Sequence, residues 1–533
     1  MRKILIIFIL GLIAIGGLRF YRLGSVPGGF FRDEAALAYN TYRIWTTGTD
    51  EYSIPYPTVF RSFEVFFLPA YVYLSAPVIG LLGLSEFSGR VISAIAGTVI
   101  VIVIGLIAAK LWGKKAGIAG LIIAGISPWA IYYSRGAFEG NLGVMFFTLM
   151  VLTWLNFTRN KKPGWLALSG LFSVLAMYSY QAERLVVPVW ILAAIWLGRK
   201  FIWQNKKIAV IPAMAGIILL IPLLKLTLSP AGYFRATGVS IWKQNRSPPG
   251  WVEGKNNFWY LRIRQVLALY LSYYSPRNLF FDNDYNKQRA AENYSVFYAW
   301  MMIPLAAGIW SLRKPKNTGE KLLWVWLLAG PLPATATADP FHTYRALLVF
   351  PALGLVMARG MQIIWGKFGK LALIGSIIIA LVSVAGFWWD YSAITQAVRA
   401  NEWDYGYKRV FEVIRAHTEI DRWVIDDPTT AAYIQVLMFA PEYRQGYDQE
   451  IKKIVNKNNY YSDPNILRVF TWDNLKIRTI SWYNIDTSGK TGYVAHSSRL
   501  VDGELQTIPG ARLIEQINYP SGKAAFRILT VIR

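Results

Sequence analysis

Two adjacent carboxylates, Asp33 and Glu34, are the residues of this 533-residue chain best suited to proton transfer. They follow the first apolar run closely and open a stretch with helical spacing. Carboxylates at a helix start also stabilise its first turn by about 0.3–1 kcal/mol, so a purely structural role is the alternative. Adjacent helical positions point about 100° apart, so the two cannot flank one bond as a glycosidase pair does. We therefore expect at most one of them to act as a general base.

Further ionisable residues lie at the ends of other apolar runs. Arg135 and Glu139 are four residues apart, and Glu183 and Arg184 are neighbours. An exposed pair of this kind contributes only roughly 0.2–0.5 kcal/mol, so stability is a weak reason to have it. Side chains that snorkel at a helix end are the structural alternative. All four residues are site candidates.

The segment 339–345, Asp-Pro-Phe-His-Thr-Tyr-Arg, supplies an arginine and one of three histidines. The planar fork of donors on Arg345 matches phosphate oxygens. A lone histidine such as His342 is more often a hydrogen-bonded structural residue than a ligand or base. We therefore expect Arg345 to be the stronger phosphate candidate of the two.

Asp282 and Asp284 form an Asp-x-Asp triplet, which can hold a divalent metal in soluble enzymes that use nucleotide sugars. Such triplets are also common in solvated loops, so we expect a structural role and keep both residues as site candidates. Gly-rich phosphate loops, a His-Glu-x-x-His zinc motif and a nucleophile elbow are missing from the sequence.

The elements that position these residues are membrane helices. With 54% hydrophobic and 16% charged residues, the chain carries more apolar surface than one soluble core could bury. Cysteine is absent, which excludes a disulfide framework and a thiolate zinc site. The net charge of +25 comes from Lys and Arg at the ends of apolar runs, so it reflects membrane orientation rather than nucleic-acid binding.

Uncharged apolar runs predict eleven membrane-spanning helices. A twelfth run, 65–84, is broken by Pro69 and Pro77, and whether it crosses decides the topology. If it does not cross, 17 basic residues lie in cytoplasmic loops, and if it crosses they all move outside, so the positive-inside rule favours the first model. The eleven runs are 4–18, 91–109, 116–133, 141–158, 165–180, 185–198, 208–224, 295–312, 322–338, 346–358 and 371–389.

This topology divides the chain into two predicted domains. Residues 1–389 form the membrane domain, with a cytoplasmic N-terminus, a first external loop at 19–90 and a long external loop at 225–294. Residues 390–533 have the composition of an external α/β domain. Within it we expect a helix around 407–414, a strand at 422–426, a helix capped by Asp427 with Pro428 in its first turn, and a hairpin of strands 513–518 and 526–532.

Taken together, these residues resemble the GT-C glycosyltransferases, in the bacterial branch similar to protein O-mannosyltransferases and the lipid A aminoarabinose transferase. The likeness covers most of the membrane part. Its carriers are 31–35, Ser127-Pro128-Trp129 with Ser134-Arg135-Gly136, 178–185, Tyr274-Ser275-Pro276 with 279–281, and His342 with Arg345. Two departures are Phe67-Leu68-Pro69, where many relatives carry Lys-Pro-Pro, and Gln288-Arg289, where relatives often have Arg-His.

The resemblance implies a polytopic α-helical fold with an external α/β domain, and transfer of a sugar from a polyprenyl-phosphate donor. The acceptor would be a protein, lipid or glycan outside the cytoplasm, and the site would face outward from the cell membrane. Asp33 would be the base, with Glu34 orienting it or holding a divalent metal. Arg345 and Arg135 would neutralise the departing phosphate, with His342 and Arg184 beside them.

Two other functions also fit a polytopic chain with polar outer loops. A transporter or lipid flippase would usually place ionisable groups at mid-membrane depth, where each costs about 2.5–3.5 kcal/mol on insertion scales, and the spans here are nearly free of charge. A non-catalytic envelope assembly protein is the second alternative. The family resemblance does not by itself prove an intact site, so this alternative stays open.

Overall fold

The computed structural model describes residues 2–63, 65–204, 206–229, 241, 258–337, 339–428, 431–455, 460, 470–472, 474–482, 485 and 490–531. The chain forms two compact units. The helical unit comprises Met1–Tyr21 and Ile92–Asp390, and the mixed unit comprises Arg22–Val91 and Tyr391–Arg533. One boundary between the units falls at residue 390, and residues 22–91, which include most of the predicted first external loop, group with the C-terminal part. Two stretches of the predicted long external loop, 230–240 and 242–257, lie outside the described residues.

The helical unit is built mainly from apolar helices, and each predicted run contains helical residues. The run 116–133 is divided between two helices, the runs 346–358 and 371–389 lie in one, and three further helices, at 199–204, 258–272 and 276–280, were not predicted. Proline and glycine at their ends set the boundaries, because proline cannot continue a preceding helix. The helices are α1 (Arg2–Phe20), α4 (Glu86–Trp112, which starts in the mixed unit), α5 (Lys114–Ile126), α6 (Pro128–Ser134), α7 (Glu139–Asn160), α8 (Pro163–Ser179), α9 (Glu183–Leu197), α10 (Arg199–Gln204), α11 (Lys206–Thr227), α13 (Phe258–Ser272), α14 (Pro276–Phe280), α15 (Met302–Leu312), α16 (Thr318–Ala329), α17 (Leu332–Thr335) and α18 (Val349–Trp389), with short 3-10 turns η1 (Lys287–Arg289) and η2 (Ala299–Met301).

By length and apolar composition, three helices among the described residues are able to cross a membrane. They are Glu86–Trp112, Glu139–Asn160 and Val349–Trp403. The bent pair α5 and α6 counts as a fourth if it is one broken span, with an angle of 59° between its parts. The described parts of several other apolar helices run only 10–17 residues, so the eleven spans stay a prediction.

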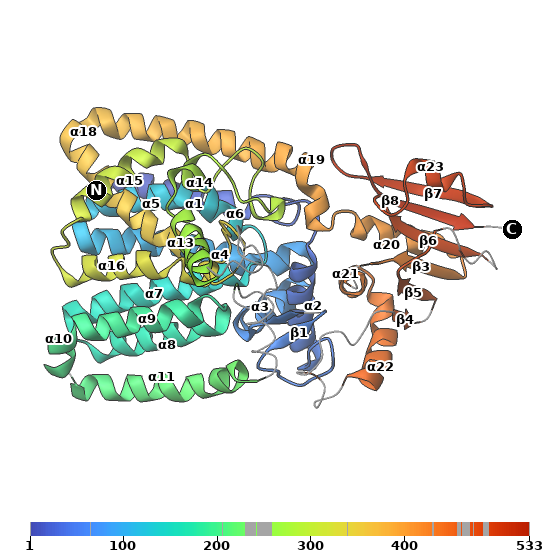
Figure 1. Ribbon diagram of the computed structural model, residues 1–533, viewed down its shortest axis with the longest axis horizontal. Coiled ribbons are helices and arrows are strands. Elements are labelled where there is room, and N and C mark those ends of the chain that lie inside the picture. Colours follow the sequence, from blue (N-terminus) through green and yellow to red (C-terminus); the bar gives the residue numbers. More distant parts are fainter. Residues whose placement is uncertain are drawn as a thin grey trace. The chain divides into compact units, whose positions relative to one another are not determined.

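Helix α18 contains two helical runs joined at Gly369, as the sequence predicts for 346–358 and 371–389. Gly369 has φ +62° and ψ −140°, which interrupts the helix. The indole nitrogen of Trp365 donates to the hydroxyl of Ser376 at 3.1 Å. Eleven residues of straight helix would separate them by about 16 Å, so the chain must turn back here. Figure 1 shows the two arms of α18 meeting at that turn.

The proline-broken run 65–84 forms short elements of the mixed unit. Strand β2 (Val65–Phe67) pairs with β1 (Phe60–Ser62), and α3 (Pro69–Leu82) follows. Helix α3 has 14 residues, about 21 Å at 1.5 Å per residue, whereas the hydrocarbon core of a bilayer is about 30 Å thick. It packs against α2 (Arg32–Thr47). The topology in which this run does not cross is consistent with that length.

The C-terminal part of the mixed unit is a six-stranded sheet of order β4-β5-β3-β6-β8-β7 (Figure 1). Strand β3 is parallel to both β5 and β6, while the other pairs are antiparallel. Its core includes Tyr493, Leu500 and Leu529. The bounds are β3 (Arg422–Asp426), β4 (Phe470–Trp472), β5 (Leu475–Arg478), β6 (Thr491–His496), β7 (Ala511–Asn518) and β8 (Ala524–Val531), with α19 (Thr395–Arg399), η4 (Ala400–Trp403), α20 (Tyr407–Ala416), α21 (Ala432–Phe439), α22 (Arg444–Ile454) and α23 (Asp502–Leu505).

The predicted helix around 407–414, the strand at 422–426 and the C-terminal hairpin are confirmed as α20, β3 and β7–β8. The predicted start of the next helix was wrong. Helix α21 begins at Ala432, so Pro428 precedes it instead of opening its first turn. The carboxylate of Asp427 still accepts a hydrogen bond from the backbone N–H of Ala432 at 2.7 Å, which satisfies one donor of that first turn.

Candidate active site

Asp33 is the second residue of α2, and its neighbours form the helix start. Phe31 precedes the helix in an extended conformation, and Arg32 is the first helical residue. The carboxylate of Glu34 accepts from the backbone N–H of Phe31 at 3.1 Å, which is one half of a capping box. Asp33 is half-buried while Glu34 is buried, so the two carboxylates have different surroundings.

Arg90 binds Glu34 and the loop before α2 with all of its donors. Its Nε and Nη2 donate to the two oxygens of Glu34 at 2.8 and 2.7 Å. The remaining N–H groups donate to the backbone carbonyls of Leu23 and Pro27, at 3.1 and 3.0 Å, and of Gly29 at 2.7 Å. The side chains of Arg90 and Glu34 are 0% and 3% exposed. Five donors with five acceptors make this a saturated, rigid contact.

This geometry separates the roles of the two carboxylates. Glu34 is committed to Arg90 and to the helix start, so a role in orienting the loop fits it and a metal role does not. Among the residues that the model describes, no group of three or more His, Cys, Asp or Glu side chains is placed to hold a metal ion. The role of Asp33 as the base stays a prediction.

A second polar centre lies in the helical unit, in the turn 339–345. Arg345 donates from Nη1 to the carboxylate of Asp339 at 3.1 Å, and its side chain is 23% exposed. The backbone N–H of Arg345 donates to Nδ1 of His342 at 3.2 Å. Burial lowers the pKa of His342, and the charges of Arg345 and Arg289 lower it further, so the imidazole is neutral. In the turn 339–345, the positive charge of Arg345 therefore lies next to a neutral imidazole.

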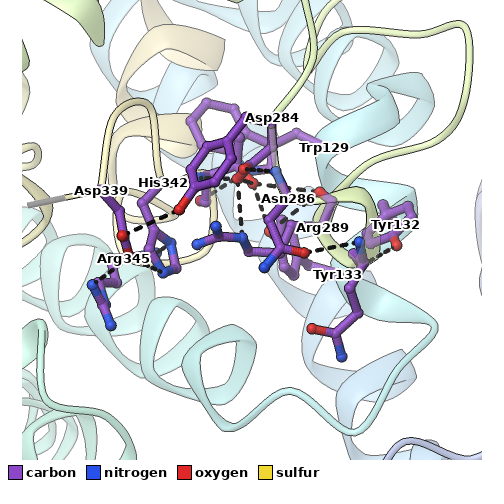
Figure 2. A network of polar contacts seen from close by, with 12 residues as sticks. Trp129, Tyr132, Tyr133, Asp284, Asn286, Arg289, Asp339, His342 and Arg345 are labelled. Atoms are coloured by element: carbon purple, nitrogen blue, oxygen red, sulfur yellow. Dashed lines mark hydrogen bonds and ion pairs between the residues drawn. The ribbon is translucent and has the colours of Figure 1, made fainter. Parts of the chain in front are cut away.

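Asp284 and Arg289 anchor this turn to the external loop that follows α14. Asp284 accepts from the backbone N–H and the hydroxyl of Thr343, both at 2.9 Å, and from the backbone N–H of Asn286 at 3.0 Å. Nε of Arg289 lies 3.3 Å from Asp284, and its guanidinium lies over the ring of Tyr285. Burial raises the pKa of Asp284, while Arg289 opposes that rise. Figure 2 shows the hydrogen bond from Asn286 to Asp284 and the ion pair between Asp284 and Arg289 as dashed lines.

Tyr344 joins this turn to two other turns that the sequence singled out. Its hydroxyl accepts from the backbone N–H of Gly140, one residue after Glu139 at the start of α7. Its ring centroid lies 4.8 Å from that of Tyr180, in the turn that leads to Glu183. A Cβ on Gly140 would lie 2.8 Å from the Tyr344 ring, so only glycine allows this approach. Three segments distant in sequence therefore meet at Tyr344.

The remaining candidates have other surroundings. Arg135 is fully buried and donates to the backbone carbonyls of Leu18, Arg19 and Tyr21 at 2.8–3.1 Å, so it satisfies the end of α1 and not the centre around Arg345. Arg184 donates to the hydroxyl of Thr227 at 3.3 Å.

The two aspartates of the Asp-x-Asp triplet also have separate partners. Asp282 pairs with the exposed Arg277 at 2.5 Å, whereas Asp284 is buried against Thr343 and Arg289. A small cavity beside Asp284 and Arg289, lined also by Tyr133 and Tyr294, has a volume of about 20 Å³. That volume holds one water molecule and no sugar.

The comparisons with known proteins place the fold in a class. Residues 68–225, from the start of α3 to α11, match the family model for dolichyl-phosphate-mannose-protein mannosyltransferase. No curated protein sequence matches the chain. The matched stretch is a minority of the 533 residues, and it includes the proline-broken segment and the Arg135 turn.

Solved structures extend the likeness over the whole chain. Cupriavidus metallidurans ArnT is 12% identical with a TM-score of 0.53, and 98% of each chain is covered. A second ArnT structure, bound to undecaprenyl phosphate, gives a TM-score of 0.52 over the same share. The Archaeoglobus fulgidus oligosaccharyltransferase tethered to an acceptor peptide is also 12% identical, with a TM-score of 0.51, covering 82% of this chain and 63% of that one. The predicted resemblance to GT-C glycosyltransferases is confirmed at the level of the fold.

Sequence reasoning missed the partners that hold the candidates in place. Arg90, Asp339 and Tyr344 are absent from the predicted site, and Arg289 was noticed only as a departure from related sequences. Arg90 stands alone at the start of a long apolar helix, and its full burial there is the sign of a satisfied cation. Its partner Glu34, however, is 56 residues away in sequence, and no local pattern connects them.

Proposed function

We propose that the chain is a membrane glycosyltransferase that moves a sugar from a polyprenyl-phosphate donor to a hydroxyl of an extracytoplasmic acceptor. The observation that carries the proposal is the end-to-end likeness to ArnT, whose structure has been solved with undecaprenyl phosphate bound. The Archaeoglobus fulgidus oligosaccharyltransferase, which shares the fold, is known in complex with a dolichol-phosphate and an inhibitory peptide. Lipid phosphate is thus the ligand chemistry common to these structures.

In the proposed reaction, Asp33 takes the proton of the acceptor hydroxyl while the acceptor oxygen attacks the anomeric carbon. The bond between that carbon and the phosphate oxygen breaks, and the polyprenyl phosphate leaves with the electron pair. Phosphate is already a good leaving group, so it needs charge stabilisation more than protonation. Arg345 and Arg289 supply that charge beside a neutral His342. One base and a cationic group suffice.

The location belongs to the same proposal. The chain would be a multi-pass protein of the cell membrane with its N-terminus inside and its C-terminal sheet outside. The charge count supports this orientation, because 17 basic residues then lie in cytoplasmic loops. The eleven spans are a prediction that belongs to this proposal. The acceptor is expected to be a protein, a lipid or a glycan, and the proposal does not specify the sugar.

The decisive experiment measures sugar transfer from a defined polyprenyl-phosphate sugar in proteoliposomes. Asp33→Asn should lower the turnover by about 10²–10⁴-fold, because that is the usual contribution of a general base. Glu86→Gln is the matched control, since Glu86 is also a carboxylate in a first helical turn and pairs with Lys408 at 3.3 Å. Its activity should stay at the wild-type level.

Full activity of the Asp33→Asn protein would overturn the role of Asp33, and no transfer by the wild-type protein from any such donor would overturn the glycosyltransferase assignment. Sealed spheroplasts check the orientation with the same preparations. A C-terminal tag should be digested by added protease, and protection of the tag would contradict the proposed topology.

A further inference from the structure

The C-terminal part of the mixed unit reaches the helix start that carries Asp33. Asp404 follows η4 in a left-handed conformation, with φ +49°. Its two oxygens accept from Nη2 and Nε of Arg32 at 2.9 and 3.1 Å. One of them also accepts from the backbone N–H of Arg32 at 2.9 Å. Asp404 is therefore bound to the side chain and the backbone of the residue directly before Asp33.

The backbone contact supplies a cap that the local sequence lacks. The usual residues at the position before a helix are Ser, Thr, Asp and Asn, whose side chains accept from the first N–H groups. Phe31 occupies that position and has no such acceptor. Asp404, which is 372 residues away in sequence, provides the oxygen instead. Its charge also lies at the positive end of the helix dipole.

The loop before α2 is held by the same C-terminal segment. The backbone N–H of Gly28 donates to the side-chain oxygen of Gln396. Gly29 has φ +85°, and a Cβ there would lie 2.3 Å from the carbonyl oxygen of Trp403. Glycine is therefore required at position 29 both by its conformation and by the close approach. Residues 396–404 thus pack against the loop that leads to Asp33.

Asp404 also binds the charged guanidinium of Arg32. Arg32 adjoins Asp33 in sequence and interacts with it electrostatically. An arginine held against a general base by an ion pair would stabilise the ionised carboxylate and weaken it as a base. In the structure, the fork of Arg32 is instead occupied by both oxygens of Asp404. The ion pair is partly buried, with side-chain exposures of 30% and 12%.

We propose that Asp404 is a positioning residue for Asp33: Asp404 caps the start of α2 and binds the guanidinium of Arg32, which fixes the backbone directly before the base. This inference rests on the proposed function, because it takes Asp33 to be the base. It gives the C-terminal domain a direct part in turnover. Asp404 itself touches neither the acceptor nor the donor in this role.

The test compares three variants of the full-length protein in the proteoliposome assay. Asp404→Ala removes both the cap and the ion pair and should lower kcat by about 10–100-fold, the scale expected for a displaced catalytic group. Asp404→Asn keeps an oxygen for the cap and loses the charge, so its kcat should lie between those of Asp404→Ala and the wild type. KM for donor and acceptor should stay unchanged in both.

Glu515→Ala is the matched control. Glu515 forms a bidentate pair with Arg409, at 2.8 and 3.0 Å, on the exposed surface of the same domain. Its removal should leave kcat at the wild-type value. If Asp404→Ala does not accumulate as folded protein, Asp404→Asn carries the comparison, because it retains the cap.

Three outcomes separate the ideas. A wild-type kcat in both Asp404 variants, together with loss of activity in Asp33→Asn, would overturn the positioning role and leave the proposed function intact. A rise in KM without a change in kcat would also overturn it, because a misplaced base lowers turnover. Full activity of Asp33→Asn would instead remove the proposed function on which the inference rests.

Discussion

The polar centre around Asp33 and the polar centre around Arg345 are built in opposite ways. Near Asp33, Arg90 meets Glu34 in a fully buried, bidentate ion pair, and all five of its donors have acceptors at 2.7–3.1 Å. Near Arg345, the ion pairs of Arg345 and Arg289 with described residues have N–O distances of 3.1 and 3.3 Å, and Arg345 is 23% exposed. Arg90 is saturated by the protein, whereas Arg345 and Arg289 each form one ion pair with an aspartate in the described part of the chain.

The difference follows from what each centre would have to do. A general base must be held in one geometry, since a displacement of about 1 Å can cost about 10²-fold in rate. A phosphate-binding centre must exchange protein contacts for contacts with a ligand, so its cations cannot be saturated beforehand. An arginine whose N–H donors are all bound by the protein therefore fits a positioning role. An arginine whose donors are only partly bound fits a ligand-binding role. On this basis we propose that Arg90 positions the loop before α2 and that Arg345 binds the phosphate.

The largest effect is expected from breaking the saturated centre. Arg90→Ala leaves Glu34 buried without its cation and frees three backbone carbonyls, so it should lower the free energy of unfolding by about 3–5 kcal/mol. Thermal unfolding in detergent measures this as a lower Tm.

Lys408→Ala is the control for that experiment. Lys408 forms an exposed pair with Glu86, and exposed pairs contribute about 0–1 kcal/mol. Equal, small losses in the two variants would mean that Arg90 does not hold the loop, and the distinction between the two centres would fail.

A smaller effect is expected at the partly paired centre. Arg345→Ala should leave the Tm close to that of the wild type and raise the donor Kd by about 10–100-fold. A hydrogen bond to a charged group contributes about 1.5–3 kcal/mol, and 1.4 kcal/mol is a factor of ten in affinity. Binding of a fluorescent polyprenyl-phosphate analogue to the protein in detergent gives the Kd.

Arg277→Ala is the matched control, because Arg277 is an exposed arginine with an aspartate partner, Asp282, on the neighbouring loop. Its donor Kd should not change. Equal weakening by the two variants would indicate a general effect of surface charge and would remove the phosphate role from Arg345.

The sequence contained enough information for the local part of this picture. The change in composition after residue 389 distinguished the membrane helices from the C-terminal α/β part, and a start of α2 at Asp33 and Glu34 follows from helix-start electrostatics. The turn with His342 and Arg345 was found from side-chain chemistry alone. These features depend on residues within one or two turns of each other, where spacing determines geometry.

The long-range partners could not be predicted. Asp404 is 372 residues from Arg32, and Glu34 is 56 residues from Arg90. Hydrophobic periodicity gives the face of a helix but not which distant loop packs on it. Arg135 is a second example: its position at a helix end suggested a phosphate ligand, whereas its Nη1 and Nη2 donate to backbone carbonyls at the end of α1 and at Tyr21. Burial decides whether such an arginine is structural or ligand-binding, and local sequence spacing does not determine burial.

Glu51 offers a third kind of centre in the mixed unit: a buried carboxylate whose donors are neutral. It accepts from the hydroxyl of Tyr433 at 2.7 Å, the side-chain amide of Asn40 at 2.9 Å and the hydroxyl of Ser62 at 3.1 Å. Burial raises the pKa of Glu51 to about 8, and the neighbouring Asp50 contributes to the rise. Glu34, in the same unit, instead forms an ion pair with Arg90.

The smallest change, when expressed per pH unit, is a pH dependence of the free energy of unfolding. Because the pKa of Glu51 is higher in the folded than in the unfolded chain, the folded state binds a proton that the unfolded state has lost between about pH 4.5 and 8. Its stabilising contribution is complete below that range and is lost as the pH rises through it, by at most about 1.4 kcal/mol per pH unit. Glu51→Gln should flatten the fall of Tm between pH 5 and 8, while Glu450→Gln, at the exposed pair with Lys453, should not. An unchanged slope in Glu51→Gln would show that neutral donors suffice to keep this buried carboxylate ionised. A cation such as Arg90 would then not be needed to hold a buried carboxylate such as Glu34.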